Sequence, residues 1–455
     1  MTRARLADVG LVVLAVFITI VNSGFSKPLW IDEYLHFAMG SLTFTEAVEV
    51  IAETTGDGVN WGQTGTYLFL DYLLGSVFGA NLWALRSPSI ISGLVLLLAA
   101  VWFMRTRGLG RSWQLLVLLA LAGQATLMYY IGEARPYLPM AAASVAVLAF
   151  YSTPLSVRRR FWVAALGAFG LLFGAAMHPY WLPFTLVIIA FVLWVGYRDG
   201  SIQTIRDTRS QLSLFLLVPS VVIYAALAFV TWLSSPSTPT ADPWEWMGSP
   251  EGGLRTLLST HLDFMSPTLS VLNPLTALVP FSIDVTRLVS LVLVVALTLG
   301  AALIPTWRAA LTPPLVLLWL AIVSSLALAA LSLVNGYWIL QRQWLAGIAL
   351  IAVAFVWGLG ELWKIRRHRN RWVVGPIVTL VWILITTQAA VTLFGAINRI
   401  GSHESTFSDF RTVSGSNSDV YERYLGSGDV VPAGNVNVVR GGPVWREHAR
   451  YYGRK

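Results

Sequence analysis

Two adjacent carboxylates, Asp32 and Glu33, follow the first long apolar run of the chain in the stretch WIDEYLH. A carboxylate held beside an acceptor hydroxyl can act as a general base, which contributes about 10²–10⁴-fold to a reaction rate. The same pair could instead lie in the first turn of a helix, where negative charge interacts favourably with the helix dipole. Residue types and spacing alone leave both interpretations open.

A second polar group lies in the stretch YYIGEARPY, between two later apolar runs. Glu133 and Arg135 stand there among aromatic residues, and Pro136 suits the first turn of a following helix. The planar fork of an arginine binds two phosphate oxygens at once, so Arg135 could hold an anionic group. A solvated ion pair at a membrane boundary is the alternative.

Further polar residues lie at the edges of later apolar runs. Arg342, in the stretch LQRQW, has no acidic neighbour in sequence, so it could snorkel to the membrane interface or bind a lipid phosphate. His178 could cap a helix or, with Tyr180, bind substrate. His261 and Asp263 are two residues apart, a spacing that fits no strong metal-binding pattern.

Long blocks of apolar residues separate these motifs and must position them. Of the 455 residues, 56% are hydrophobic and 12% are charged, whereas soluble domains carry about 25% charged residues. Blocks of about 20 apolar residues cross a ~30 Å hydrocarbon core as helices. We expect an all-α polytopic membrane protein with about eleven spans. These are 7–23, 87–104, 112–131, 135–151, 161–177, 179–196, 212–233, 286–305, 312–333, 343–360 and 373–396.

The basic residues orient these spans. With eleven crossings, every basic cluster lies on one side, which carries 17 basic and 4 acidic residues, and the other side carries 14 basic and 19 acidic residues. The positive-inside rule places the basic side, with the N-terminus, in the cytoplasm and the C-terminal tail outside. An apolar stretch at 66–83 would reverse every later cluster if it crossed. We therefore expect it to lie in or dip into the outer interface.

The outer side holds three large pieces that do not span the membrane. Residues 44–53 of the first outer loop, 24–86, predict an amphipathic helix that lies flat on the membrane surface. We divide the chain into a catalytic transmembrane module at 1–233, an outer loop at 234–285, transmembrane helices at 286–396 and an outer tail at 397–455.

Several classes of chemistry have no motif in this chain. It has no cysteine, so it forms neither disulfides nor zinc–thiolate sites. We find no Walker loop, GxGxxG after a strand, HExxH or GxSxG. We expect no nucleotide cofactor, and a lipid-borne donor reached from the outer side. Membrane topology accounts for the net charge of +8, so we expect no nucleic-acid partner.

These motifs together resemble the GT-C glycosyltransferases, in the family 39-like branch that includes protein O-mannosyltransferases and the lipid A aminoarabinose transferase. The Asp32–Glu33 pair, the surface helix after it, the stretch ALRSPS, the turn GEARPYL and Arg342 carry the resemblance. It covers roughly residues 1–200 well. The resemblance implies a GT-C type bundle whose extracytoplasmic loops carry the active site.

Members of that family move a sugar from a polyprenyl-phosphate carrier to a hydroxyl or phosphate of an acceptor at the outer membrane face. By this resemblance, Asp32 is the catalytic base, Glu33 its acidic companion and Glu133 the acid of the second outer loop. Arg135 and Arg342, with Tyr137 beside them, would bind the carrier phosphate.

Some relatives bind a divalent ion between the two acidic loops. Asp32 and Glu133, with Glu33, could supply oxygen ligands to Mg²⁺, Mn²⁺ or Zn²⁺, and nothing in the sequence selects among them. Many relatives also carry a His-Pro-Pro stretch where this chain reads NWGQT at 60–64. That departure leaves the acceptor and metal environment there undefined.

The resemblance thus implies an inverting hexosyl- or pentosyltransferase of the bacterial plasma membrane. Its acceptor would be a cell-envelope glycan, lipid or protein. A transporter or flippase of a lipid-linked glycan is the alternative, although the middles of the spans are nearly free of charge. A third interpretation is a non-catalytic scaffold that presents its outer loops to a cell-envelope partner.

Overall fold

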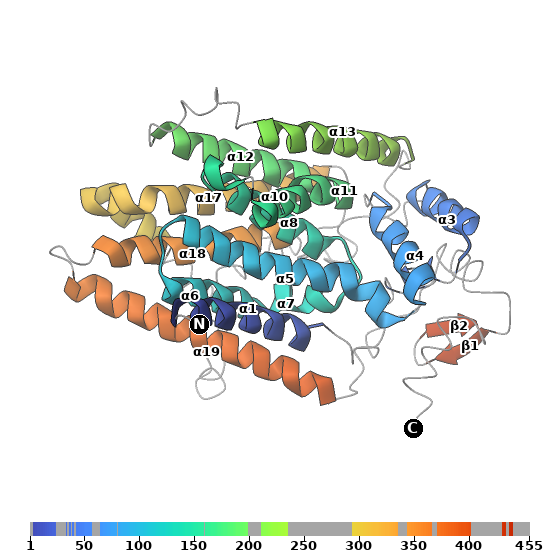
Figure 1. The fold of residues 1–455 in the computed structure, drawn as a ribbon, viewed down its shortest axis with the longest axis horizontal. Helices are drawn as coiled ribbons and strands as arrows, with labels where there is room; N and C mark the ends of the chain where they lie inside the picture. The colour runs from blue at the N-terminus through green and yellow to red at the C-terminus, as the bar shows by residue number, and fades with distance from the viewer. Residues whose placement is uncertain are drawn as a thin grey trace.

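The computed structural model describes most of the transmembrane part of the chain. The described residues are 3–23, 33, 36–37, 39–40, 42–56, 64–79, 81–158, 160–198, 211–234, 294–334, 344–365, 371–401, 430–433 and 436–439. A helix lies in each of the eleven ranges predicted as spans (Figure 1). The expected helical bundle of an integral membrane protein is therefore confirmed.

The helices follow one another along the chain with short connections between most of them. They are α1 (Arg3–Val21), α3 (Phe44–Gly56), α4 (Thr66–Phe78), α5 (Leu82–Thr106), α6 (Arg111–Ala122), α7 (Ala125–Tyr129), η1 (Tyr130–Gly132), α8 (Tyr137–Tyr151), α9 (Leu155–Arg158), α10 (Phe161–Ala168), η2 (Phe169–Phe173), α11 (Gly174–Met177), α12 (Trp181–Arg198), α13 (Gln211–Ser234), a helix at Val294–Leu303, α17 (Pro305–Val334), α18 (Leu345–Ile365) and α19 (Arg371–Gly401).

Not all of these helices are long enough to cross a membrane unaided. Among the described residues, five are long and apolar enough, in α5, α12, α17, α18 and α19, or six if the bent pair of α6 and α7 is one span. Eleven straight crossings are therefore not confirmed. Helix α4 has 13 residues, about 20 Å at 1.5 Å per residue, which is shorter than a ~30 Å core. This length agrees with the prediction that 66–83 does not span.

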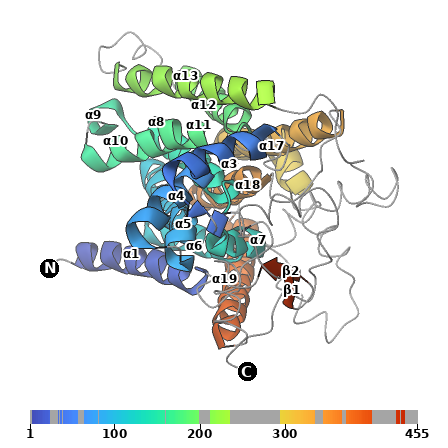
Figure 2. The ribbon, with the colours of Figure 1, turned by 90° about the vertical axis from the view of Figure 1, so that its right-hand side faces the viewer.

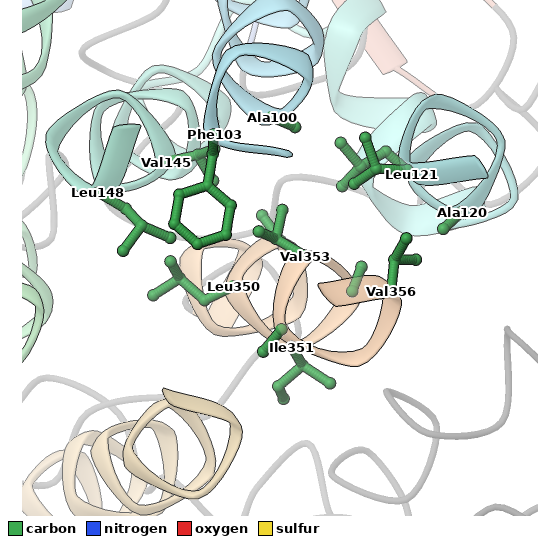
Figure 3. Packing of buried hydrophobic residues seen from close by; sticks show 14 of the residues in the cluster. Ala100, Phe103, Ala120, Leu121, Val145, Leu148, Leu350, Ile351, Val353 and Val356 are labelled. Atoms are coloured by element: carbon green, nitrogen blue, oxygen red, sulfur yellow. The ribbon is translucent and has the colours of Figure 1, made fainter. Parts of the chain in front are cut away.

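Helix α18 forms the centre of the bundle. It is apolar on every side, almost all of it is buried, and it packs against α17, α8 and α6. Figure 3 shows its residues Leu350, Val353 and Val356 between Phe103 of α5 and Leu121 of α6. A helix that is hydrophobic all round belongs in such a core. It gives the surrounding helices a fixed frame.

The predicted span at 112–131 is bent rather than straight. Helix α6 ends at Ala122, and the segment Thr126–Gly132 continues at an angle of 74°. Gln388 of α19 donates a hydrogen bond to the carbonyl of Gly123 at the bend, over 3.2 Å. The bend leads the chain through η1 into the turn that holds Glu133 and Arg135.

Described residues of several basic clusters gather at one end of the bundle, which we call the basic end. Asp8 of α1 lies 3.1 Å from Arg111 and 4.0 Å from Arg105. Lys364 at the end of α18 donates to the backbone carbonyl of Arg107 over 3.1 Å, and Arg198 of α12 donates to that of Ala309 in α17 over 3.0 Å. These contacts confirm that clusters far apart in sequence share one side.

Helices α3 and α4 lie at the other end of the bundle (Figures 1 and 2). Ala47 and Val50 of α3 pack with Leu68 of α4 and with Met39 of the first outer loop, and we call this group the satellite cluster. At the edge of the same apolar face of α3, Phe44 and Val48 stay exposed, as expected for a helix that rests on lipid.

Two short features complete the fold. Thr43 and Glu46 form a capping box at the start of α3, in which the Thr43 N–H donates to Glu46 Oε2 over 2.7 Å and the Glu46 N–H donates to Thr43 Oγ1 over 3.4 Å. In the tail, β1 (Val430–Ala433) pairs antiparallel with β2 (Val436–Val439). The predicted loop at 234–285 and the rest of the tail lie outside the described residues.

Candidate active site

A buried ion pair joins the first outer loop to α5. Arg86 Nε lies 2.9 Å from Glu33 Oε1, and Arg86 Nη2 lies 2.7 Å from Glu33 Oε2. Both side chains have an exposed fraction of 0%. Two parallel hydrogen bonds between charged groups fix both the distance and the orientation of the carboxylate.

The same carboxylate also binds the second motif. The backbone N–H of Ala134 donates to Glu33 Oε1 over 2.8 Å. Residues 101 positions apart are thereby in direct contact, so Glu33 and the GEARPYL turn meet as the sequence predicted. We call this end of the bundle the site end. Arg86 and Arg105 lie at opposite ends of α5, so the site end and the basic end are about 28 Å apart.

The geometry of Glu33 differs from that expected of a catalytic acid. Both of its oxygens already accept hydrogen bonds from Arg86, and one accepts a third from Ala134. A carboxylate held in this way favours a positioning role over that of a free base. Its partner Arg86 was not among the predicted site residues, although it stands in the quoted stretch ALRSPS. Arg86 lies one turn inside an apolar helix, and charged residues within such helices usually pair with another group.

The turn between η1 and α8 places Glu133 and Arg135 inside the bundle end. The exposed fraction is 2% for Glu133 and 8% for Arg135, so neither belongs to the solvated pair considered from the sequence. The Arg135 N–H donates to the backbone carbonyl of Glu133 over 2.9 Å, which closes the turn. The Arg135 carbonyl accepts from the hydroxyl of Ser89 on α5 over 3.2 Å.

A row of aromatic rings extends from this turn to α12. The ring of Tyr130 lies 6.0 Å from that of Tyr137, and the Tyr137 ring lies 5.4 Å from the His178 ring. His178 is in turn 4.7 Å from Tyr180. The structure therefore brings the candidate substrate-binding residues Tyr137, His178 and Tyr180 together.

His178 also has a structural task. The backbone N–H of Tyr180 donates to His178 Nδ1 over 3.1 Å, just before α12 begins at Trp181. Nδ1 is thus an acceptor, and its lone pair is used by the chain itself. This is the helix-capping interpretation of His178.

A second buried pair was not predicted. Nδ1 of His36, in the first outer loop, lies 2.6 Å from Oδ2 of Asp71 on α4. The His36 side chain is 2% exposed and the Asp71 side chain is 1% exposed. Burial raises the pKa of the Asp71 carboxyl well above its usual range, and the charge of Glu33 raises it further. Asp71 Oδ1 accepts no hydrogen bond from the described residues.

Two predicted site residues, Asp32 and Arg342, lie outside the described residues. Asp32 is next in sequence to the anchored Glu33. Arg342 precedes α18, which begins at Leu345. Their assigned roles stay predictions.

The described residues contain no group of three His, Cys, Asp or Glu side chains arranged to hold a metal ion. Glu33, the carboxylate expected to help, has its oxygens on Arg86 and Ala134. A metal site in this region would therefore depend on Asp32 and Glu133. We assign no step of the reaction to a metal.

Comparison with known proteins gives a limited result. No protein-family profile matches the chain, and neither does any curated protein sequence. Two crystal structures of ArnT from Cupriavidus metallidurans are similar. The apo structure has 12% identity and a TM-score of 0.46, with 88% of this chain and 77% of that chain covered. The structure bound to undecaprenyl phosphate has 15% identity and a TM-score of 0.32, with 84% and 77% covered.

Both TM-scores lie below 0.5. The proposals below therefore rest on the residues of this chain.

Proposed function

We propose that this chain is a membrane glycosyltransferase that takes a sugar from a polyprenyl-phosphate carrier at the outer face of a bacterial plasma membrane. The hydrogen bond from the Ala134 N–H to Glu33 carries the proposal. It joins the two motifs on which the resemblance to GT-C transferases depends. This hydrogen bond also lies at the site end, away from the basic clusters. The positive-inside rule assigns the site end to the outer side of the membrane.

In the proposed reaction, Asp32 removes the proton of an acceptor hydroxyl, and the hydroxyl oxygen bonds to the anomeric carbon of the sugar. The bond from that carbon to the carrier phosphate oxygen breaks, and the phosphate leaves with the electron pair. A single displacement of this kind inverts the configuration of the sugar. The lipid phosphate is already a good leaving group, so no strong general acid is required.

The remaining residues take supporting roles. Glu33, fixed by Arg86, positions the neighbouring Asp32. Arg135 and Arg342 stabilise the charge that develops on the carrier phosphate, which fixed cations in a dry site do most effectively. Glu133 is the second acid of the site. A metal held by Asp32 and Glu133 would add positive charge at the same place.

The test uses the purified protein in nanodiscs with a panel of polyprenyl-phosphate-linked hexoses and pentoses and an extract of cell-envelope acceptors. We expect release of free polyprenyl phosphate together with a glycosylated product. Arg135→Ala and Arg342→Ala should lower kcat and raise the KM for the donor, whereas Arg111→Ala at the basic end should change neither. Movement of the lipid across vesicles without sugar transfer would overturn the proposal in favour of a flippase.

A further inference from the structure

Helix α4 carries two buried polar side chains that the proposed reaction does not use. Tyr67 and Asp71 are each 2% exposed, and their spacing of four residues places them on the same face of the helix. Buried polar groups are almost always hydrogen-bonded. Their partners lie in two different segments of the site end.

Asp71 ties α4 to the first outer loop through the 2.6 Å contact with His36 Nδ1. His36 comes three residues after Glu33, so one short segment has two buried anchors, one to α5 and one to α4. The edge of the His36 ring also meets the ring of Tyr67, with centroids 5.3 Å apart. The two polar residues of α4 thus contact the same histidine.

Tyr67 ties α4 to α5 and to the turn. Its hydroxyl lies 2.8 Å from Ser89 Oγ. The Ser89 hydroxyl can donate to the carbonyl of Arg135 over 3.2 Å, and the Tyr67 hydroxyl can donate to Ser89 Oγ or to the carbonyl of Leu85 on α5, which lies 3.5 Å away. A hydrogen-bond chain therefore runs from α4 through α5 to the backbone of the GEARPYL turn.

Apolar and backbone contacts also hold α4 against the first outer loop. Leu68 is buried in the satellite cluster. A Cβ atom at Gly75 would lie only 2.1 Å from the Cα atom of Gly40, so the helix and the first outer loop touch backbone to backbone. Polar and apolar contacts together fix the position of α4 against α5 and the first outer loop.

We propose that α4 positions the two halves of the candidate site against each other, with His36, Tyr67 and Asp71 as positioning residues. Through Asp71 it holds the segment that contains Asp32 and Glu33, and through Tyr67 it holds the turn that contains Glu133 and Arg135. The inference rests on the proposed function for its catalytic consequence. Its structural content stands on the contacts alone.

Hydrogen exchange of the nanodisc-embedded protein tests the structural content. Asp71→Leu should raise amide exchange at least tenfold in three segments, 33–40, 66–78 and 130–136, and leave α18 unchanged. Ser76→Ala, on the exposed side of the same helix, is the control and should change none of them. A rise confined to 66–78 would overturn the proposal, because α4 would then dock without positioning its neighbours.

A double variant separates the His36–Asp71 bond from simple loss of packing. His36→Phe and Asp71→Leu each leave one buried polar group without its partner, whereas the double variant removes both, which is far less costly. We expect the double variant to recover most of the exchange protection. Protection no better than in the single variants would overturn the role of the bond.

Kinetics test the catalytic consequence. Displacing catalytic groups by about 1 Å costs on the order of 100-fold in rate, so Asp71→Leu should lower kcat by about that factor, with the KM for the donor changed little. Asp71→Asn keeps a hydrogen-bond acceptor for His36, so its kcat should lie within about tenfold of the wild-type value. Tyr67→Phe should also lower kcat, with Tyr72→Phe on the same helix as the matched control. A change in KM alone would contradict positioning.

The proposed function and the positioning role of α4 can be refuted separately. If the wild-type chain transfers no sugar from any donor, the proposed function fails, and the exchange data still decide whether α4 links the two segments. If transfer is normal in Asp71→Leu and exchange is unchanged, the positioning role fails while the proposed function stands.

Discussion

The two ends of the bundle handle charge in opposite ways. At the basic end, the pair of Arg111 and Asp8 has side chains 45% and 41% exposed. At the site end, Arg86 and Glu33 are both 0% exposed. Exposed pairs are screened and add little to stability, whereas a buried pair holds a fixed geometry and is costly to break.

The difference suggests separate purposes. The pair at the basic end stays near water, and basic residues near water are the ones that the positive-inside rule counts. The charges of Arg86 and Glu33 at the site end are removed from water at a large cost in desolvation, and the two residues come from distant segments of the chain. An arrangement of that kind is expected where side chains must be held in place for chemistry.

Breaking the Arg86–Glu33 pair should have the largest effect. Arg86→Leu leaves Glu33 as a buried charge without its partner, which costs about 3–5 kcal/mol of stability. Sugar transfer should be lost with it. Unfolding in mixed micelles with SDS, followed by tryptophan fluorescence, measures the stability, and Arg111→Leu at the basic end is the matched control. Equal stability of the two variants would contradict the comparison.

A second variant sharpens that result. Glu33→Leu combined with Arg86→Leu removes both charges, so stability should recover in large part. Transfer should not recover, because Asp32 would lose the anchored neighbour that positions it. Recovery of transfer in the double variant would show that the pair serves stability alone.

Gly75 should be less tolerant of a side chain than a glycine near the basic end. In Gly75→Ala, the new Cβ atom meets the backbone of Gly40 at 2.1 Å, and overpacking of this kind costs about 1–3 kcal/mol. Gly10→Ala in α1 is the control, since nothing lies within 4 Å of its Cβ position. The same unfolding assay measures both, and a Gly75 variant as stable as the Gly10 variant would refute the close packing.

The smallest effects should come from pH, with opposite signs in α3 and α4. Hydrogen bonds from Thr43 lower the pKa of Glu46 below 4.5, so the α3 cap is intact above that value and weakens as pH falls through the lowered pKa. Burial raises the pKa of Asp71 above 3.8, so the proton favours the folded state and that contribution declines as pH rises through the raised pKa.

Hydrogen exchange of 44–52 and 66–78 at several pH values, corrected for intrinsic rates, measures both trends. Glu46→Gln should abolish the trend in 44–52 and leave that in 66–78. Trends of the same sign in the two segments would contradict the assignment.

Much of this architecture follows from apolar blocks and charge placement. The helical ranges, the grouping of basic clusters and the meeting of WIDEYLH with GEARPYL were predicted from sequence. The bend after Ala122 was not predicted. The hydrogen bond from Gln388 of α19 to the carbonyl of Gly123 at the bend is a contact between distant segments, which no periodic pattern reveals.

The pairing of Arg86 with Glu33 and of Asp71 with His36 was also not predicted from the sequence. Arg86 and Asp71 each stand in or beside an apolar run, where a charge demands a partner. Their partners lie 53 and 35 residues earlier, and sequence alone does not rank Glu33 and His36 above other polar residues of the loop. The demand for a partner was visible in the sequence, and its identity required the fold.

The central claim is that the site end carries out sugar transfer with Asp32 as its base. Turnover of a polyprenyl-phosphate-linked sugar by wild type, Asp32→Asn and Asp8→Asn, at equal amounts of folded protein, tests it most directly. The same substitution is thereby compared at the two ends of the bundle. We expect Asp32→Asn to abolish turnover and Asp8→Asn to retain it. Near-normal turnover in Asp32→Asn would contradict the account.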